Sequence, residues 1–207
     1  MALAKSILMY GDRADQPTAG PENDGCYFRV QDEGDIVEQS DGSAWTALSV
    51  VSVGTSGVVQ VVNTQTGAVA SGSTVMPADD TIPQNTEGDQ YMTLAITPTN
   101  ASNKLRIDVV AHVACDTSSR NIAVALFQDS TANALAVTDS PVLGGGANFM
   151  RSVNFTHYMT AGTTSATTFK VRAGVETSGT VTFNGAGASR FYGGVFASSI
   201  TITEIVP

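Results

Sequence analysis

Apolar and polar residues alternate most clearly over residues 105–113. Leu105, Ile107 and Val109 are apolar, whereas Arg106 and Asp108 lie between them. This period of two places the apolar side chains on one face of a β-strand. Similar β-prone runs recur through the second half of the chain. The expected strands span residues 91–97, 105–113, 121–128, 134–138, 151–159, 167–175, 180–184 and 195–205.

Turn signals separate these runs at regular spacing, for example Gly144-Gly-Gly146 and Thr177-Ser-Gly179. Short strands punctuated in this way are typical of a sandwich of antiparallel sheets. The pattern therefore predicts an all-β fold, with a β-sandwich or jelly-roll knob over residues 90–207.

Residues 1–50 have a different pattern, with turn residues crowded around two short β-prone runs. The runs are Cys26–Gln31 and Ile36–Gln39, and the loop Asp32-Glu-Gly-Asp35 joins them. A loop of this length that contains glycine predicts a β-hairpin. Because one hairpin is at best marginally stable in water, it must pack on another surface. Residues 1–50 are therefore predicted to form a small hairpin module.

Residues 51–89 contain short β-prone pieces punctuated by glycine, and they show no helical period. A structureless loop of this length would be unusual inside a compact domain. Strands that pair with the same segment of neighbouring chains would satisfy its backbone hydrogen-bonding groups. We therefore expect an extended linker that intertwines with its copies.

Composition supports the all-β prediction and excludes several functions. The chain has 25 Thr, 19 Ser and 20 Gly, and only 14% of its residues are charged. Threonine suits a pleated sheet, and glycine and serine suit turns. The net charge of −9 argues against nucleic-acid binding, which needs a basic surface. No apolar run approaches the length of a membrane span, and residues 1–10 do not resemble a secretory signal.

The acidic residues are concentrated at the front of the chain. Residues 1–50 hold nine acidic and three basic residues, and residues 51–100 hold four acidic residues and no base. One interpretation is an ordinary solvated front end. The other is an acidic foot that docks on a partner.

Catalytic and metal-binding signals are weak. Neither His112 nor His157 accompanies a Gly-x-Ser-x-Gly elbow, and no pair of carboxylates stands out for glycan hydrolysis. Asp79-Asp80 lacks the fuller oxygen set of a calcium site, so these residues are interpreted as turn acids. Cys26 and Cys115 are expected to be free, buried thiols. We predict no enzymatic activity, no cofactor and no metal.

A resemblance to a known module appears in the front end. The matching pieces are Pro17-Thr-Ala-Gly20, Gly25-Cys-Tyr-Phe28, Asp32-Glu-Gly34 and Ser40-Asp-Gly-Ser-Ala-Trp45. Together they resemble a short module found near the N-termini of bacteriophage fibre and tail proteins. The aromatic residue usual in its second strand is absent, and Val37-Glu38 stands in its place.

This resemblance implies that the front end attaches the protein to a virion. The candidate attachment residues are Pro17, Tyr27, Phe28 and Trp45. Tyr27 is expected to neighbour Trp45 across the hairpin. An alternative is that Tyr27 and Trp45 form a small local core and not a docking surface.

The second half carries a further resemblance, to a domain that recurs in phage virion fibres and in prophage genes. It implies a trimeric, jelly-roll-like knob at the distal end of a virion appendage, without a residue-level binding site. The matching pieces are Asp79-Asp-Thr-Ile-Pro-Gln84, Glu87-Gly88, Met92-Thr-Leu-Ala-Ile-Thr-Pro98, the run from Ala125 to Leu135, the run from Met159 to Phe169, and Ser198-Ser-Ile-Thr-Ile-Thr-Glu204.

The sequence thus predicts a structural protein of a bacteriophage particle, located in the virion. It would be a homotrimeric fibre, spike or decoration protein, mounted by residues 1–50 on another virion protein, with the capsid favoured over the tail. Its knob would point outward and contact host-surface glycan. The alternatives are a free carbohydrate-binding module without an anchor and a glycan-degrading tail spike.

Overall fold

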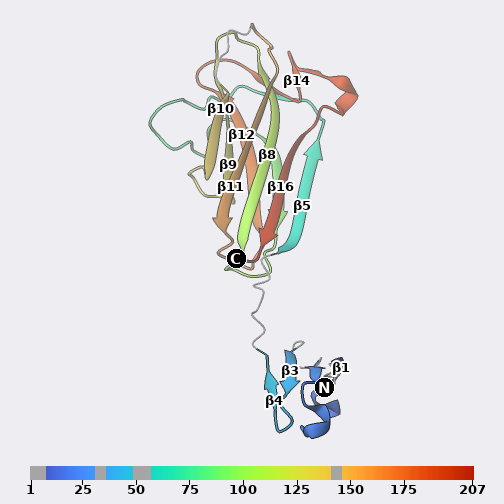
Figure 1. Cartoon of the computed structure of the whole chain (residues 1–207). Helices are drawn as coiled ribbons and strands as arrows, with labels where there is room; N and C mark the ends of the chain where they lie inside the picture. Colours follow the sequence, from blue (N-terminus) through green and yellow to red (C-terminus); the bar gives the residue numbers. More distant parts are fainter. Residues whose placement is uncertain (1–7, 31–35, 49–56, 141–145) are drawn as a thin grey trace. The chain divides into compact units, whose positions relative to one another are not determined.

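The computed structural model describes residues 8–30, 36–48, 57–140 and 146–207 (Figure 1). It confirms the all-β fold class. The chain divides into two compact units, Met1–Thr55 and Ser56–Pro207. Helical structure in the described ranges is limited to 3₁₀ turns at Arg13–Asp15, Pro21–Asn23 and Tyr192–Gly194, and no helix there could cross a membrane.

The N-terminal unit holds a sheet in the order β1-β2-β3-β4. Its strands are β1 (Leu8–Gly11), β2 (Tyr27–Val30), β3 (Ile36–Ser40) and β4 (Trp45–Ala47). β1 runs parallel to β2, and the other neighbours are antiparallel. The predicted hairpin is the β2–β3 pair, although its loop, Asp32–Asp35, lies outside the described residues.

A tight turn joins β3 to β4. The Asp41 carboxylate accepts hydrogen bonds from the backbone N–H groups of Ser43 and Ala44, at 2.9 and 2.8 Å. Gly42 has φ +83°, a conformation that suits glycine. The hydrogen bond from the Ser43 hydroxyl, followed by those from the backbone, lowers the pKa of Asp41. This turn places Trp45 at the start of β4.

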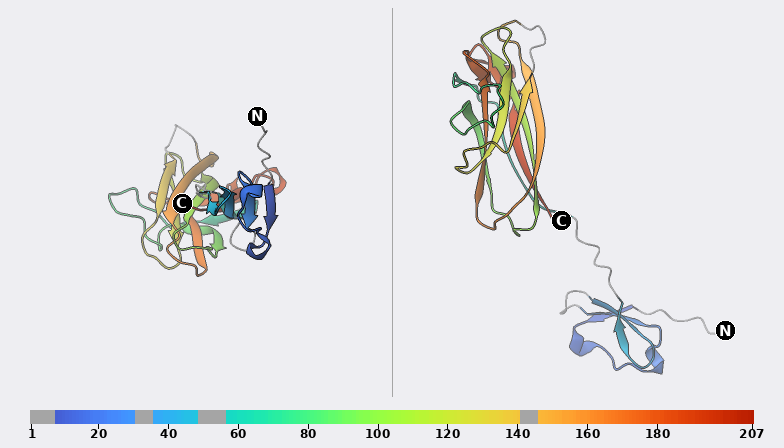
Figure 2. Two further views of the ribbon diagram at one scale, coloured as in Figure 1. Left: turned by 60° about the horizontal axis from the view of Figure 1, so that its bottom comes forward. Right: turned by 90° about the vertical axis from the view of Figure 1, so that its left-hand side faces the viewer.

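The C-terminal unit is a sandwich of two sheets, as the strand pattern predicts (Figure 2). One sheet has the order β10-β9-β12-β7. The other has the order β5-β16-β8-β13-β6, and β11 also pairs with β8. β14 and β15 form a separate two-stranded sheet. The bounds are β5 (Val58–Thr66), β6 (Ala70–Gly72), β7 (Asp89–Ile96), β8 (Lys104–Cys115), β9 (Ile122–Gln128), β10 (Ala136–Ser140), β11 (Arg151–Thr160), β12 (Thr167–Val175), β13 (Val181–Phe183), β14 (Gly185–Ala186), β15 (Ser189–Arg190) and β16 (Ser198–Ile205).

Alternation builds the core between the two sheets. On β8, Leu105, Ile107 and Val109 are at most 1% exposed, and the residues between them face outward. They pack in one cluster with Phe169 of β12 and Leu126 of β9. The period of two read from the sequence is therefore the period of burial.

The middle of the chain differs from the expected linker over residues 51–89. β5 pairs with β16, and β6 pairs with β13 of the same chain. Val62 of β5 also packs against the core of the sandwich. The backbone groups that needed partners find them on β16, about 140 residues further along the chain. The C-terminal unit consequently begins at Ser56, and the expected boundary at residue 90 is corrected.

The segment before β7 covers part of the four-stranded sheet. Met76 is 0% exposed and packs with Ala125 and Phe127, which face outward from β9. The Met76 N–H donates to the carbonyl of Val175 at 2.8 Å. The chain thus buries apolar side chains on the outer face of this sheet as well as in the core.

A buried carboxylate on the six-stranded sheet accepts hydrogen bonds from the loop after β7. Glu204 on β16 is 0% exposed. Its Oε1 accepts hydrogen bonds from the Thr99 backbone N–H at 2.8 Å and from Asn103 Nδ2 at 2.7 Å, and its Oε2 accepts one from Gln60 Nε2 at 2.6 Å. Burial by itself raises the pKa of Glu204, but these hydrogen bonds outweigh it and lower the pKa to about 2.

Candidate attachment site in the N-terminal unit

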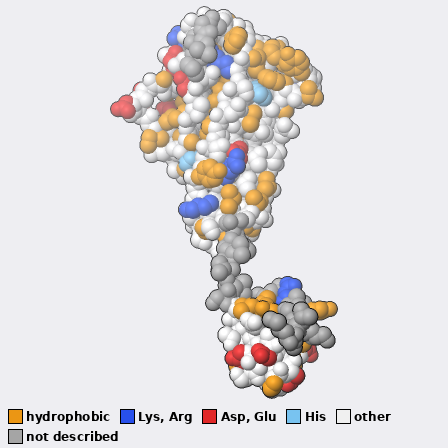
Figure 3. All heavy atoms as spheres, viewed as in Figure 1, with side chains coloured by type: hydrophobic (Ala, Val, Ile, Leu, Met, Phe, Trp, Pro, Cys, Tyr) orange, Lys and Arg blue, Asp and Glu red, His pale blue; other side chains and the backbone are white. Residues whose placement is uncertain are grey.

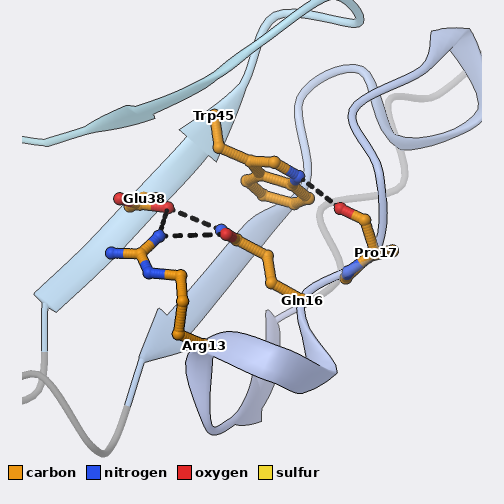
Figure 4. Close-up of polar contacts among 5 residues, drawn as sticks. All are labelled: Arg13, Gln16, Pro17, Glu38 and Trp45. Carbon is orange, nitrogen blue, oxygen red and sulfur yellow. Dashed lines mark hydrogen bonds and ion pairs between the residues drawn. The ribbon is translucent and has the colours of Figure 1, made fainter.

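The small sheet of the N-terminal unit has two different faces. In the strand register, Phe28 lies opposite Glu38, and Ser40 lies opposite Trp45, so these four residues share one face. Phe28 is 2% exposed and Glu38 is 7% exposed. The covering residues come from the segment between β1 and β2, as Figure 4 shows for Arg13, Gln16 and Pro17.

Trp45 is held in this buried layer by two contacts. Its indole Nε1 donates a hydrogen bond to the carbonyl oxygen of Pro17 at 2.7 Å (Figure 4). Its ring meets the ring of Phe28 edge-on, with centroids 6.1 Å apart and an interplanar angle of 65°. An edge-to-face arrangement at this distance is favourable for aromatic pairs. Trp45 therefore packs in a local core with Phe28, whereas the alternative interpretation had placed it with Tyr27. Its role in attachment remains a prediction.

A polar cluster completes the layer beside Trp45. Arg13 Nη1 donates to Glu38 Oε2 at 2.7 Å, and Gln16 Nε2 donates to the same oxygen at 2.5 Å. Arg13 Nη1 also donates to Gln16 Oε1 at 3.0 Å. The hydrogen bonds from Arg13 and then Gln16 hold the pKa of Glu38 below its ordinary value. A buried carboxylate is thus matched by a cation and an amide, as burial of a charge requires.

The structure brings together three of the four residues that the sequence singled out. Pro17, Phe28 and Trp45 lie in one layer. Tyr27 does not join them, because successive residues of a strand point to opposite faces. Its cross-strand partner is Gln39, so the expected contact between Tyr27 and Trp45 is corrected to a contact between Phe28 and Trp45.

Sequence reasoning missed the cluster of Arg13, Gln16 and Glu38. A signal for it was present, because Val37-Glu38 stands where the module that the front end resembles has an aromatic residue. A carboxylate at a position facing Phe28 needs a partner, and Arg13 is one of the few basic residues in this part of the chain. Its distance along the chain concealed the pairing.

The other face of the small sheet has no comparable cover among the described residues. Tyr10 is 74% exposed, Leu48 is 39% exposed, and Tyr27 is half-buried. The register places Tyr10 and Tyr27 on the face opposite Phe28 and Trp45, and Leu48 directly follows β4. This face can therefore meet a partner without disturbing the local core.

The C-terminal unit contains the residues that the sequence analysis considered for catalysis or metal binding, and their contacts are those of ordinary strand and turn residues. His112 stacks on Phe196 with ring centroids 4.1 Å apart, and burial lowers its pKa. His157 lies on β11 opposite Ile107, and burial lowers its pKa too. Asp79 accepts hydrogen bonds from the N–H and hydroxyl of Thr81, as a turn acid does. Within the described ranges, no group of three or more His, Cys, Asp or Glu side chains is arranged to hold a metal ion.

A surface cleft of about 410 Å³ lies between residues 79–83 and residues 134–137. Asp79 and Asp80 line it. Asp139 lines a neighbouring cleft, and its pKa is raised by burial and then by the nearby Glu176. The absence of an enzymatic activity remains a prediction. Both cysteines are free and buried, which confirms that expectation.

Comparisons with known proteins give no family assignment. No protein family and no curated protein matches the sequence. Solved structures with similarity include an Eiger TNF from S. frugiperda, with 8% identity, TM-score 0.40, and coverage of 70% of this chain and 92% of that one. A CBM4 structure has 14% identity, TM-score 0.31, and coverage of 49% and 63%. The VP2 subviral particle of infectious bursal disease virus has 10% identity, TM-score 0.36, and coverage of 85% and 47%. All three TM-scores are below 0.5, so the fold description rests on the strand order and register given above.

Proposed function

We propose that this chain is a structural protein of a bacteriophage particle. It is a short homotrimeric fibre, spike or decoration protein, mounted by its N-terminal unit on another virion protein, the capsid being favoured over the tail. The C-terminal sandwich is the outward knob, which contacts host-surface glycan.

The observation that supports this proposal most is that the chain forms two separate units, the smaller of which has its own core and one uncovered face. Pro17, Phe28 and Trp45, which carry the resemblance to phage attachment modules, build the core of a separate small unit. That core leaves the opposite face, with Tyr10 and Tyr27, for contact with a partner. A small folded foot and a self-contained sandwich suit a protein that is fixed at one end.

Sedimentation with purified particles that lack this protein tests the attachment. The full chain should co-sediment with such particles, and a chain without residues 1–55 should keep its β-type circular dichroism but stay in the supernatant. Cross-linking of the bound chain, followed by mass spectrometry, would identify capsid or tail as the socket. Equal co-sedimentation of both chains would contradict an anchoring role for the N-terminal unit.

A further inference from the structure

The outer faces of the two sheets of the sandwich differ in how much of their apolar surface the rest of the chain covers. On the four-stranded sheet, residues around Met76 cover Ala125 and Phe127, and all three are at most 1% exposed. On the six-stranded sheet, Val61 of β5 and Tyr158 of β11 remain 55% and 59% exposed. Figure 1 shows β11, β8, β16 and β5 side by side, and their outward side chains make one surface, which we call the open face.

The strand register defines which residues belong to the open face. Thr203 lies between Val61 and Arg106, and Arg106 lies opposite Tyr158, so one row crosses all four strands. The outward residues are Val59, Val61, Asn63 and Gln65 of β5; Ser199, Thr201, Thr203 and Ile205 of β16; Lys104, Arg106, Asp108, Val110 and His112 of β8; and Ser152, Asn154, Thr156, Tyr158 and Thr160 of β11.

The open face carries little net charge. Arg106 Nε lies 3.0 Å from Asp108 Oδ2, and the Thr156 hydroxyl donates to Asp108 at 2.6 Å. Lys104 donates to the Thr160 hydroxyl at 2.7 Å near the end of the strand. The remaining outward residues on these strands are uncharged at neutral pH, and Figure 3 shows this side of the sandwich with few charged side chains. Asp108, the acid of the open face, is therefore neutralised within the chain.

An aromatic cluster lies at one end of the open face. The ring of Phe196 stacks on His112, and Tyr192 meets Phe196 edge-on with centroids 6.0 Å apart. Tyr192 is 76% exposed and Val195 is 86% exposed. Tyr192 also has φ +48°, which is rare for a bulky residue and costs free energy that the surrounding contacts must offset. This segment adds exposed apolar surface beside the sheet (Figure 3).

We infer that further copies of this chain cover the open face, so that it is the contact surface of the trimer; this rests on the trimeric state in the proposed function. A nearly neutral face is compatible with itself, whereas a partner recognised by its charge would require a charged face. Four strands about 4.8 Å apart and roughly eight residues long give a projected area of about 500 Å². That is comparable with the ~800 Å² of accessible surface that one partner contributes to a stable interface.

The distribution of apolar residues also indicates how the copies meet. Val59 and Val61 lie on one flank, on β5, whereas Tyr158 lies on the other flank, on β11. Two different patches on opposite flanks make a head-to-tail contact, and such a contact gives a closed ring when the rotation from each copy to the next returns to the first copy, as it does in a trimer. In this arrangement β5 of one copy packs near β11 of the next.

A charge placed on the open face of the full chain tests this assignment. Val61→Lys combined with Tyr158→Lys should raise the dissociation constant of the trimer at least tenfold, because β5 of one copy and β11 of the next then carry like charges. Analytical ultracentrifugation across a dilution series measures the mass. Val137→Lys is the matched control, because Val137 is 46% exposed on β10, the edge strand of the other sheet. The control should remain a trimer of three 21.4 kDa chains. Circular dichroism would verify that each variant is folded.

A second variant keeps the assignment falsifiable if the charged variant does not fold. Tyr158→Cys should react with a bulky maleimide at least tenfold more slowly than Val137→Cys, and both natural cysteines are buried. Equal labelling in a stable trimer would overturn the open face as the interface and leave the trimer intact. A parent protein that is monomeric would instead refute the trimer. If the thiol introduced by Tyr158→Cys is protected only after purified lipopolysaccharide is added, the face belongs to glycan and the inference is also overturned.

Discussion

The two units of the chain differ in what fills the buried side of their sheets. In the C-terminal unit, residues such as Leu105, Phe169 and Ile202 form a continuous apolar core between two sheets. In the N-terminal unit, one small sheet packs Phe28 and Trp45 beside a charged pair, Arg13 and Glu38. Apolar burial scales with area and lacks direction, whereas the charged pair depends on geometry and protonation.

The two cores predict different stabilities for the two units. A unit with few large apolar residues has a small free energy of unfolding, so the loss of a single contact removes a larger fraction of it. The sandwich should unfold later and depend mainly on packing. Trp45 is the only tryptophan of the chain, so its fluorescence reports the N-terminal unit. Circular dichroism reports mainly the sandwich, and the two signals allow the units to be compared in one sample.

The largest effect is expected for Phe169→Ala, which empties a fully buried site in the core of the sandwich. The free energy of unfolding of the C-terminal unit should fall by about 3–5 kcal/mol, because apolar contact is lost and a cavity remains. Urea unfolding followed by circular dichroism measures this. Phe149→Ala is the control, since Phe149 is 58% exposed, and it should change stability by less than about 0.5 kcal/mol. An equal shift of the Trp45 signal would show that the units unfold together.

Acid should weaken the sandwich through Glu204. Its pKa is lowered to about 2 in the folded chain, from the ordinary 4.5 expected when unfolded. Its contribution is therefore complete above pH 4.5 and is lost as the pH falls from 4.5 toward 2. The shift corresponds to a contribution on the order of 3 kcal/mol. Glu204→Gln should lower stability at pH 7 and flatten this pH dependence; a profile with the parent's slope would show that Glu204 does not cause it.

Removal of the indole should disorder the small unit and spare the sandwich. Trp45→Ala loses a half-buried ring and the hydrogen bond to Pro17, so the N-terminal unit should lose about 2 kcal/mol, roughly half the cost of emptying a fully buried aromatic site. Limited proteolysis should then cut within residues 1–48 while circular dichroism is retained. Thr46→Ala, on the exposed opposite face, should resist proteolysis like the parent. Normal incorporation of the Trp45→Ala chain into particles would remove the anchoring role from this unit.

Loss of the cation beside Glu38 should have a smaller effect. Arg13→Met keeps much of the side-chain length but leaves Gln16 as the donor to Glu38 among the contacts described above. The pKa of Glu38 in the folded chain is lowered chiefly by Arg13. The carboxylate of Glu38 therefore stabilises the fold at pH values above its pKa in the unfolded chain, and this stabilisation is lost as the pH falls below that pKa. The free energy of unfolding of the N-terminal unit should fall by about 1 kcal/mol at pH 7, a modest loss because Arg13 is partly exposed. Its acid transition, followed by Trp45 fluorescence, should move to higher pH; an unchanged transition would contradict the role of this pair.

The sequence predicted those parts of the fold that depend on local pattern. The alternation on β8 and the turn at Asp41-Gly42 depend on neighbouring residues, so both were visible. The partner of β5 was not, because β16 is far along the chain and no local signal fixes that register. The same reason hid the contact of Arg13 with Glu38, while Trp45 was found because its motif is contiguous. The outward position of Tyr27 could have been read from strand period alone.

The two natural cysteines allow the units to be compared without any mutation. Cys26 lies in the N-terminal unit at 6% exposure, and Cys115 lies at the end of β8 at 3% exposure. A buried thiol reacts only when its surroundings open, so its labelling rate reports the free energy of local opening. If the small unit has less stability in reserve, Cys26 should react first with a thiol reagent under native conditions. Both should react after denaturation without prior reduction, because both are free thiols. Mass spectrometry of peptides against time measures the two rates, and faster labelling of Cys115 would reverse the stability order inferred from the two cores.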